Sequence, residues 1–194
     1  FTALSAFGQS VEIFSKEVIY TRPKPTSGLK KTFIVNYPKV KGISTLLAQK
    51  IEKTISYEKV LSFNIKDEMG DFQWLEEATF EVNYNKKGVL SIYLNLTGVG
   101  AFEQYFAKNV IVDLRTGNKV NAKEVFTKLN GLITKIKDVQ KEEIAASIKE
   151  IKEQNDFRDV NTVELFRYVD FKRIHLENFS IKDDGVYFQY DYGF

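Results

Sequence analysis

Few side chains in this sequence are suited to catalysis. The 194 residues include one histidine, His175, and no cysteine. Thiolate nucleophiles, cysteine-rich zinc sites and paired-imidazole sites all need residues that are missing here. No G-x-S-x-G turn supplies a serine for a Ser-His-Asp arrangement, and His175 lies in a mixed, strand-like run over residues 171–176. We therefore predict no metal site and no cofactor, and we expect His175 to be an ordinary surface or half-buried histidine.

Carboxylates remain as the candidates for catalysis. Glycoside hydrolysis needs only two acids about 5 to 10 Å apart, so an enzyme that acts on cell-wall polymers stays open as an alternative. A cleft holding two converging acids, one of them with a raised pKa, would reveal it. The spacing singles out no pair from the available acids, which are Asp67, Glu68, Asp71, Glu76, Glu77, Glu103 and Asp113. The acidic segment 66–71 lacks the order of a calcium loop, and we expect a solvated turn there.

Composition excludes several classes of protein. The 28 basic and 26 acidic residues are mixed along the chain, so no long-range positive field favours nucleic acid. No apolar run approaches the roughly 18 to 20 residues that a membrane span needs. The chain begins at Phe1 without an initiator methionine. This start is compatible with a removed signal peptide or lipoprotein anchor, and equally with a trimmed domain.

The elements that would position these side chains follow from periodicity. Residues 11–20 and 32–37 are expected strands, and Pro38 is expected to end the second. An amphipathic helix is expected over residues 43–58, with an apolar stripe that should face the core: Ile43, Leu46, Leu47, Ile51 and Ile55.

Three hairpin patterns and a helical stretch follow. Residues 78–84 and 89–96 alternate around a turn at 85–88, and a shorter pair lies at 110–114 and 119–120. Helical spacing returns between residues 121 and 155, a short helix could begin at Val163, and a last hairpin spans residues 179–192. The prediction is an α+β fold, an antiparallel β-sheet of hairpins packed by amphipathic helices. We expect a smaller N-terminal α+β portion at 1–70 and a C-terminal α+β domain at 71–194, or one continuous unit.

Several ordered segments carry a resemblance to a known family. Gly98-Val99-Gly100-Ala101 occupies the place of a Gly-Gly-Ala-His turn, residues 112–117 (VDLRTG) match an aspartate-leucine-x-threonine-glycine strand end, and residues 123–126 (KEVF) match an acidic-aliphatic-Phe helix start. The stretch from residue 78 to 192 resembles a bacterial envelope domain family of unknown function. This family forms the C-terminus of peptidoglycan deacetylase-like proteins and part of the lysozyme-sensing anti-sigma factor (RsiV-like).

The resemblance implies an extracytoplasmic protein: secreted, periplasmic or lipid-anchored at the cell surface. It implies no activity, because the chemistry of the deacetylase relatives belongs to a separate domain. Val99 replaces a glycine of the family turn, and Phe102 stands where the turn often carries histidine, so no role of that histidine transfers.

The first hypothesis is a noncatalytic binding or sensing module whose partner is a cell-wall glycan or an envelope protein such as lysozyme. Aromatic faces suit both kinds of partner. The binding loop is expected over residues 98–106, with Trp74, Tyr93 and Tyr192 as further aromatics. The predicted ligand-binding residues are Gly98, Gly100, Phe102, Glu103, Tyr105 and Tyr190. A structural appendage that binds nothing specific is a third possibility.

Overall fold

The chain divides into two compact units. The structure is a computed structural model of the 194-residue chain, and it describes residues 10–153, 164, 166 and 169–190. Unit 1 holds residues 1–120 and 179–187, and unit 2 holds residues 121–178 and 188–194. The expected boundary between residues 70 and 71 stays a prediction, and strands from both sides of it pair within one sheet of unit 1.

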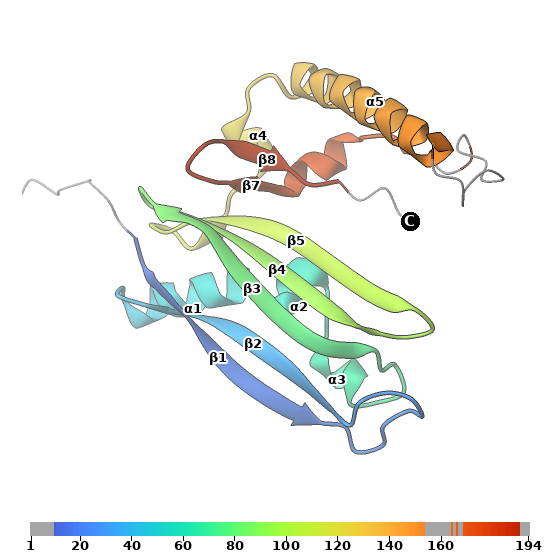
Figure 1. The fold of residues 1–194 in the computed structure, drawn as a ribbon. Helices are drawn as coiled ribbons and strands as arrows, with labels where there is room; N and C mark the ends of the chain where they lie inside the picture. Colours follow the sequence, from blue (N-terminus) through green and yellow to red (C-terminus); the bar gives the residue numbers. More distant parts are fainter. Residues whose placement is uncertain (1–9, 154–163, 165, 167–168, 191–194) are drawn as a thin grey trace, which may run out of the picture. The chain divides into compact units, whose positions relative to one another are not determined.

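A six-stranded sheet forms the frame of unit 1 (Figure 1). Its strands follow one another in sequence order, and neighbours pair antiparallel except β2 and β3, which run parallel. The predicted α+β class and the predicted hairpins are confirmed. The strands are β1 (Glu12–Thr21), β2 (Thr32–Lys41), β3 (Leu75–Lys86), β4 (Val89–Val99), β5 (Glu103–Asp113) and β6 (Asn118–Lys119).

Three helices form the crossover that a parallel pair such as β2 and β3 requires. They are α1 (Thr45–Thr54), α2 (Tyr57–Leu61) and α3 (Ile65–Glu68). The single helix expected over residues 43–58 is wrong, because α1 ends before Ser56 and a new helix starts there. The Ser56 side chain accepts a hydrogen bond from the backbone N–H of Lys59 and so caps α2.

The apolar stripe of the crossover is only partly buried. Ile51 and Ile55 are fully buried, as predicted, but Leu46 is 81% exposed, so its assignment to the core is wrong. Leu46 lies five positions before Ile51, which places it about 140° around the helix from the buried side, at 3.6 residues per turn. Apolar type alone therefore misassigned one residue of the stripe.

Pro38 does not end β2, which continues beyond it. The backbone N–H of Arg22 donates to the carbonyl of Lys31 at 2.9 Å, and this bond fixes which residues of β2 aim their backbone groups at β1. By the alternation of antiparallel pairs, Pro38 faces away from β1. On that side β2 pairs with β3 only at Ile34 and Val35, so a proline further along removes no ladder hydrogen bond.

The same edge of β2 is closed beyond Val35 by two side chains. The Tyr57 hydroxyl donates to the carbonyl of Asn36 at 2.8 Å, and a Glu52 carboxylate oxygen accepts from the N–H of Val40 at 3.0 Å. These groups, together with the proline that has no N–H, satisfy a strand edge that would otherwise be open to pairing.

The turn between β3 and β4 has the chemistry that the sequence predicts. Lys87 and Gly88 both have positive φ, 54° and 76°, which is the geometry of a type I′ hairpin turn. Along β4, Leu90, Ile92 and Leu94 are fully buried on one face of the sheet. They pack into the main core with side chains from the other strands and the helices, among them Phe33, Val35, Ile51, Ile55, Leu75, Ala78, Val110 and Val112.

A buried ion pair joins the residue that follows β1 to the last residue of α3 in unit 1. Arg22 is 1% exposed and Glu68 fully buried, and Arg22 Nη2 lies 2.5 Å from Glu68 Oε2. Arg22 also donates to the carbonyls of Lys30 and Leu75, while the Glu68 carboxylate accepts from the N–H groups of Trp74 and Leu75. The solvated acidic turn predicted for this linker is therefore wrong at Glu68, whose partner lies 46 residues away in the sequence.

Unit 2 is helical over most of its described length. It contains α4 (Ala122–Val125), α5 (Leu129–Glu153) and a 3-10 helix (Arg173–Glu177). The helical prediction for 121–155 is confirmed for both α4 and α5, while Val163, the expected start of a short helix, lies outside the described residues. No described helix is both long and apolar enough to pass through a membrane.

The last hairpin returns the chain to unit 1. It consists of β7 (Phe179–Ile181) and β8 (Val186–Phe188), which confirms the prediction as far as residue 188. The N–H of Ile181 donates to the Ser91 hydroxyl at 3.1 Å, and Lys86 forms an exposed ion pair with Asp183. Unit 1 is therefore built from two separate segments of the sequence.

Candidate binding site at a hairpin tip

The glycine-containing segment at residues 98–106 is the end of the β4–β5 hairpin, and we call it the hairpin tip. The long loop expected there is wrong, because β4 continues to Val99 and β5 begins at Glu103. The two strands remain paired up to Val99 and Glu103, and the N–H of Gly100 donates to the carbonyl of Phe102 at 2.9 Å to close the turn.

Gly98 is required by the close approach of β3 to β4. A Cβ atom at Gly98 would lie 1.9 Å from the carbonyl oxygen of Trp74, where no side chain fits. The neighbouring N–H of Val99 donates to that same oxygen at 2.8 Å. At Gly100, by contrast, a Cβ would meet nothing closer than 3.8 Å. The first glycine therefore fixes the base of the tip, and the second is not demanded by packing.

Three aromatic side chains of the tip are exposed to solvent. Phe102 is 79% exposed, Tyr105 56% and Phe106 51%. Phe106 packs edge-on against Trp74, with 5.3 Å between ring centroids. Tyr105 shares a hydroxyl–hydroxyl hydrogen bond with Tyr93, and partial burial followed by this bond raises the pKa of Tyr105 to about 12. Two of the exposed rings are thus held in place by a neighbour.

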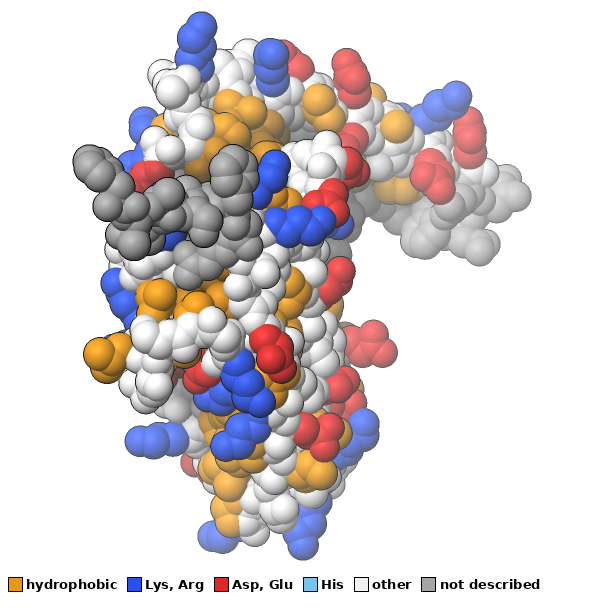
Figure 2. Space-filling model, turned by 90° about the vertical axis from the view of Figure 1, so that its left-hand side faces the viewer, with side chains coloured by type: hydrophobic (Ala, Val, Ile, Leu, Met, Phe, Trp, Pro, Cys, Tyr) orange, Lys and Arg blue, Asp and Glu red, His pale blue; other side chains and the backbone are white. Residues whose placement is uncertain are grey.

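The tip presents aromatic side chains on both faces of the hairpin. Successive residues of a strand point to opposite faces, so Tyr105 and Phe106 lie on different sides. Tyr105 pairs with Thr97 on one face, and Phe106 pairs with the buried Leu96 on the other. Such rings can stack on sugars or pack on apolar side chains of a protein. On the face of the protein shown in Figure 2, apolar side chains lie among charges of both signs.

The structure brings together five of the six predicted ligand-binding residues. Gly98, Gly100, Phe102, Glu103 and Tyr105 all belong to the tip, with Gly98 buried and the other four exposed. Their binding of a ligand stays a prediction.

The sequence did not single out Phe106 as a site residue. Phe106 lies on the core-facing side of β5, a position that is typical of a buried side chain. It is exposed because it lies near the end of the hairpin. The remaining predicted aromatics, Trp74 and Tyr93, are half-buried, and Tyr192 lies outside the described residues.

Tyr190, the sixth predicted residue, belongs to unit 2, where it packs against His175 and Phe171 with ring centroids 4.7 and 5.6 Å apart. The strand-like setting expected for His175 is wrong, since it lies in the 3-10 helix, but it is half-buried as expected. Its Nδ1 accepts from the N–H of Lys172 at 2.9 Å. Burial and the Lys172 charge lower the pKa of His175, while Asp170 opposes them.

The described residues give no support to a catalytic pair of acids. Glu68 is held by Arg22, and Glu76 lies 2.8 Å from Lys30. A general acid needs a raised pKa. Among the described residues, four carboxyl groups have a pKa that departs from its ordinary value, and in each the pKa is lowered. The largest cause in each is a hydrogen bond that the carboxylate accepts. The four are Asp113, Glu124, Asp170 and Asp184.

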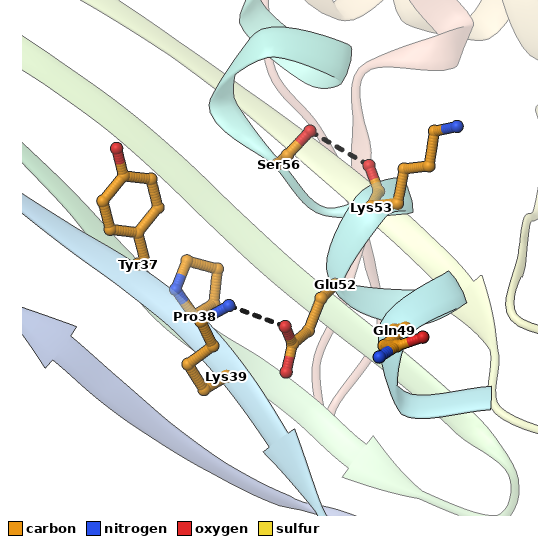
Figure 3. A pocket seen from close by; sticks show the side chains of 7 residues that line it. All are labelled: Tyr37, Pro38, Lys39, Gln49, Glu52, Lys53 and Ser56. Carbon is orange, nitrogen blue, oxygen red and sulfur yellow. Dashed lines mark hydrogen bonds and ion pairs between the residues drawn. The ribbon is translucent and has the colours of Figure 1, made fainter. Parts of the chain in front are cut away.

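A small open pocket of about 260 Å³ lies between β2 and the helices α1 and α2 (Figure 3). It is lined by Tyr37, Pro38, Lys39, Gln49, Glu52, Lys53 and Ser56. Glu52 is already engaged by the N–H of Val40 and by Lys39, whose Nζ lies 2.7 Å away. The pocket is also smaller than most ligand sites, which range from about 300 to 1,000 Å³. We assign its polar groups to closing the edge of β2.

Comparison with known proteins gives a structural match at low identity. No family model and no curated protein matches the sequence. A member of the DUF3298 family from Bacteroides fragilis matches with 15% identity and a TM-score of 0.40, over 59% of this chain and 60% of that one. A DUF3298 family protein from Pseudomonas aeruginosa PAO1 matches with 11% identity and a TM-score of 0.42, over 84% of this chain and 74% of that one.

The chain thus spans less than two thirds of the Bacteroides protein. DUF3298 is the RsiV-like, deacetylase-associated family that the sequence resembles. The family is one of unknown function, so the match assigns neither a ligand nor an activity.

Proposed function

We propose that the protein is a noncatalytic binding module of the bacterial cell envelope and that it uses the hairpin tip to hold a cell-wall glycan or an envelope protein. The observation that carries this proposal is the exposure of Phe102, Tyr105 and Phe106 at the end of one hairpin. Large aromatic side chains gain most from leaving water, and exposed clusters of them are typical of interaction sites. The extracytoplasmic location rests on the sequence resemblance alone.

The construction of the tip suits binding without rearrangement. The strands pair up to the last residue before the turn, and the close approach at Gly98 fixes the hairpin to the start of β3. Phe106 and Tyr105 each have a ring or hydroxyl partner that limits their rotamers. A surface ordered before binding loses less conformational entropy when its partner arrives.

Cosedimentation with insoluble bacterial peptidoglycan tests the proposal. The purified protein is mixed with the wall material, with and without added lysozyme, and compared with the variant Phe102→Ala/Tyr105→Ala. Leu46→Ala is the matched control, because Leu46 is an equally exposed apolar residue of unit 1 on α1. We expect the wild type and the control to pellet and the tip variant to remain in the supernatant.

The pattern of pelleting distinguishes the partners. Pelleting by peptidoglycan alone indicates a wall glycan, and pelleting only when lysozyme is present indicates a protein partner. If the tip variant pellets as well as the wild type, the site assignment is wrong. If nothing pellets in either case, a wall glycan and lysozyme are both excluded as partners, and only peptide binding at the tip would keep a binding role ahead of a structural appendage.

A further inference from the structure

The outer edge of β5 has unpaired backbone groups. The carbonyl of Ile111 accepts from the N–H of Val120, so Ile111 faces away from β4. Since backbone direction alternates along a strand, Glu103, Tyr105 and Ala107 face the same way. β6 pairs with β5 only at residues 112 and 113. Within the described part of the chain, the N–H and C=O groups of these three residues therefore have no backbone partner.

This edge differs from two other strand edges of unit 1, that of β2 and that of β1. The β3-facing edge of β2 is closed by Tyr57, Glu52 and a proline, as shown above. The outer edge of β1 is also unpaired, but Lys16 and Glu17 place charges at its centre, which is a common protection against pairing with another chain. On β5 the charged residues stand at the two ends of the open stretch, with Tyr105, Phe106 and Ala107 between them.

From this combination we propose that β5 binds an extended polypeptide segment of a partner protein by β-strand addition at its outer edge. Only an extended polypeptide offers donors and acceptors in the alternation that Glu103, Tyr105 and Ala107 require. A glycan could stack on the aromatic rings but could not continue the ladder. The inference rests on the proposed function in that both place the partner at the hairpin tip.

The side chains beside the edge define the sequence that fits. An added strand would place alternate side chains on the two faces of the sheet, one beside Tyr105 and the next beside Phe106. Phe106 packs against the ring of Trp74, and the Tyr105 hydroxyl is hydrogen-bonded to that of Tyr93. The segment therefore carries apolar or aromatic side chains at adjacent central positions and no proline there.

The test uses linear peptides displayed on phage, random in sequence and about ten residues long, which exceeds an average strand. Peptides selected on the wild-type protein are synthesised and titrated into three proteins: wild type, Ala107→Pro and Glu17→Pro. Proline at residue 107 removes an outward N–H and leaves the β4–β5 ladder intact. Glu17 faces outward on β1 by the same alternation, because Arg22 faces β2, so Glu17→Pro is the matched control.

We expect Ala107→Pro to weaken peptide binding about tenfold, the effect of one lost hydrogen bond in a dry interface, and Glu17→Pro to leave it unchanged. Amide hydrogen exchange at Tyr105 and Ala107 should slow when peptide is added. The peptide is also N-methylated at one residue at a time. Methylation should abolish binding at every second residue, where the N–H faces β5, and should be tolerated at the residues between. This result tests the ladder even if a proline variant fails to fold.

Three outcomes overturn strand addition: no peptide is enriched, Ala107→Pro binds as well as wild type, or Glu17→Pro is the variant that loses binding. These outcomes are separable from failure of the proposed function. If the tip variant loses peptidoglycan pelleting while no peptide is selected, the binding role stands and strand addition falls. If peptides bind through Ala107 while peptidoglycan never pellets, strand addition stands and the wall glycan is excluded.

Discussion

Breaking the buried pair of Arg22 and Glu68 should cost unit 1 a large part of its stability. We consider Glu68→Gln, which removes the negative charge with little change of shape. The new amide oxygen could still accept from the N–H groups of Trp74 and Leu75, but Arg22 would stay 1% exposed without a counter-charge. The substitution thus tests the charge rather than the hydrogen bonds around it.

The cost follows from the burial of both groups. Removing one partner of a buried ion pair costs about 3 to 5 kcal/mol, because the remaining charge is left uncompensated. Since glutamine keeps part of the hydrogen bonding, we expect about 3 kcal/mol for Glu68→Gln. That is a large share of the roughly 5 to 15 kcal/mol that holds a typical domain together. The double variant Arg22→Met/Glu68→Leu should lose less, because no unpaired charge remains.

Urea unfolding followed by tryptophan fluorescence measures this effect. Trp74 is the one tryptophan of the chain, and its backbone N–H donates to the Glu68 carboxylate, so its fluorescence reports on unit 1. Glu76→Gln is the control: its pair with Lys30 has side chains 32% and 66% exposed, and such a pair contributes about 0 to 1 kcal/mol. If the two substitutions lower the unfolding free energy equally, the buried charge pair does not hold the end of β1 to α3.

Further predictions concern three sites. Gly98→Ala should lower the free energy of unfolding by about 4 kcal/mol or more, measured by thermal unfolding, because its Cβ would lie 1.9 Å from a carbonyl oxygen. Gly100→Ala should change this free energy by no more than about 1 kcal/mol. Equal effects of the two substitutions would contradict the packing argument. Because the folded pKa of His175 is lowered, its contribution to stability is full above pH 6.5 and falls as the pH drops through the folded pKa. His175→Gln should flatten the plot of unfolding free energy against pH below pH 6.5. An unchanged slope in that range would contradict the lowered pKa of His175. Ultraviolet titration should show Tyr105 ionising near pH 12, and Tyr93→Phe should move this value toward 10; no movement would exclude the shared hydroxyl bond.

Local pattern predicted the parts of the fold that local physics determines. The hairpin of residues 78–84 and 89–96 was predicted from sequence, and the structure shows that Leu90, Ile92 and Leu94 lie on its buried face, because a strand has a period of two. The turn at Lys87-Gly88 was predictable because this kind of hairpin turn needs residues with positive φ, which glycine adopts readily. The position of the tip was likewise readable from its glycines.

The misses depend on contacts between distant segments. Pro38 lies in mid-strand because β3 diverges from β2, which nothing near the proline indicates. Glu68 is buried by an arginine 46 residues earlier, so its acidic surroundings suggested solvent. Phe106 has the position of a core residue and is exposed because its strand extends past most of the core. The chemistry of the edge of β5 could not be read either, because the sequence does not say which backbone groups are already bonded.

The return of β7 to unit 1 affects how the protein can be cut and reassembled. Residues 121–178 lie between the two segments of unit 1, so a ribosome must have made residue 181 before its N–H can reach Ser91. A protease cut within α5 would leave the two parts of unit 1 joined by noncovalent contacts, among them the Lys86–Asp183 pair. A fragment that stops at residue 120 should therefore be less stable than the full chain and should regain stability when a peptide spanning residues 169–194 is added.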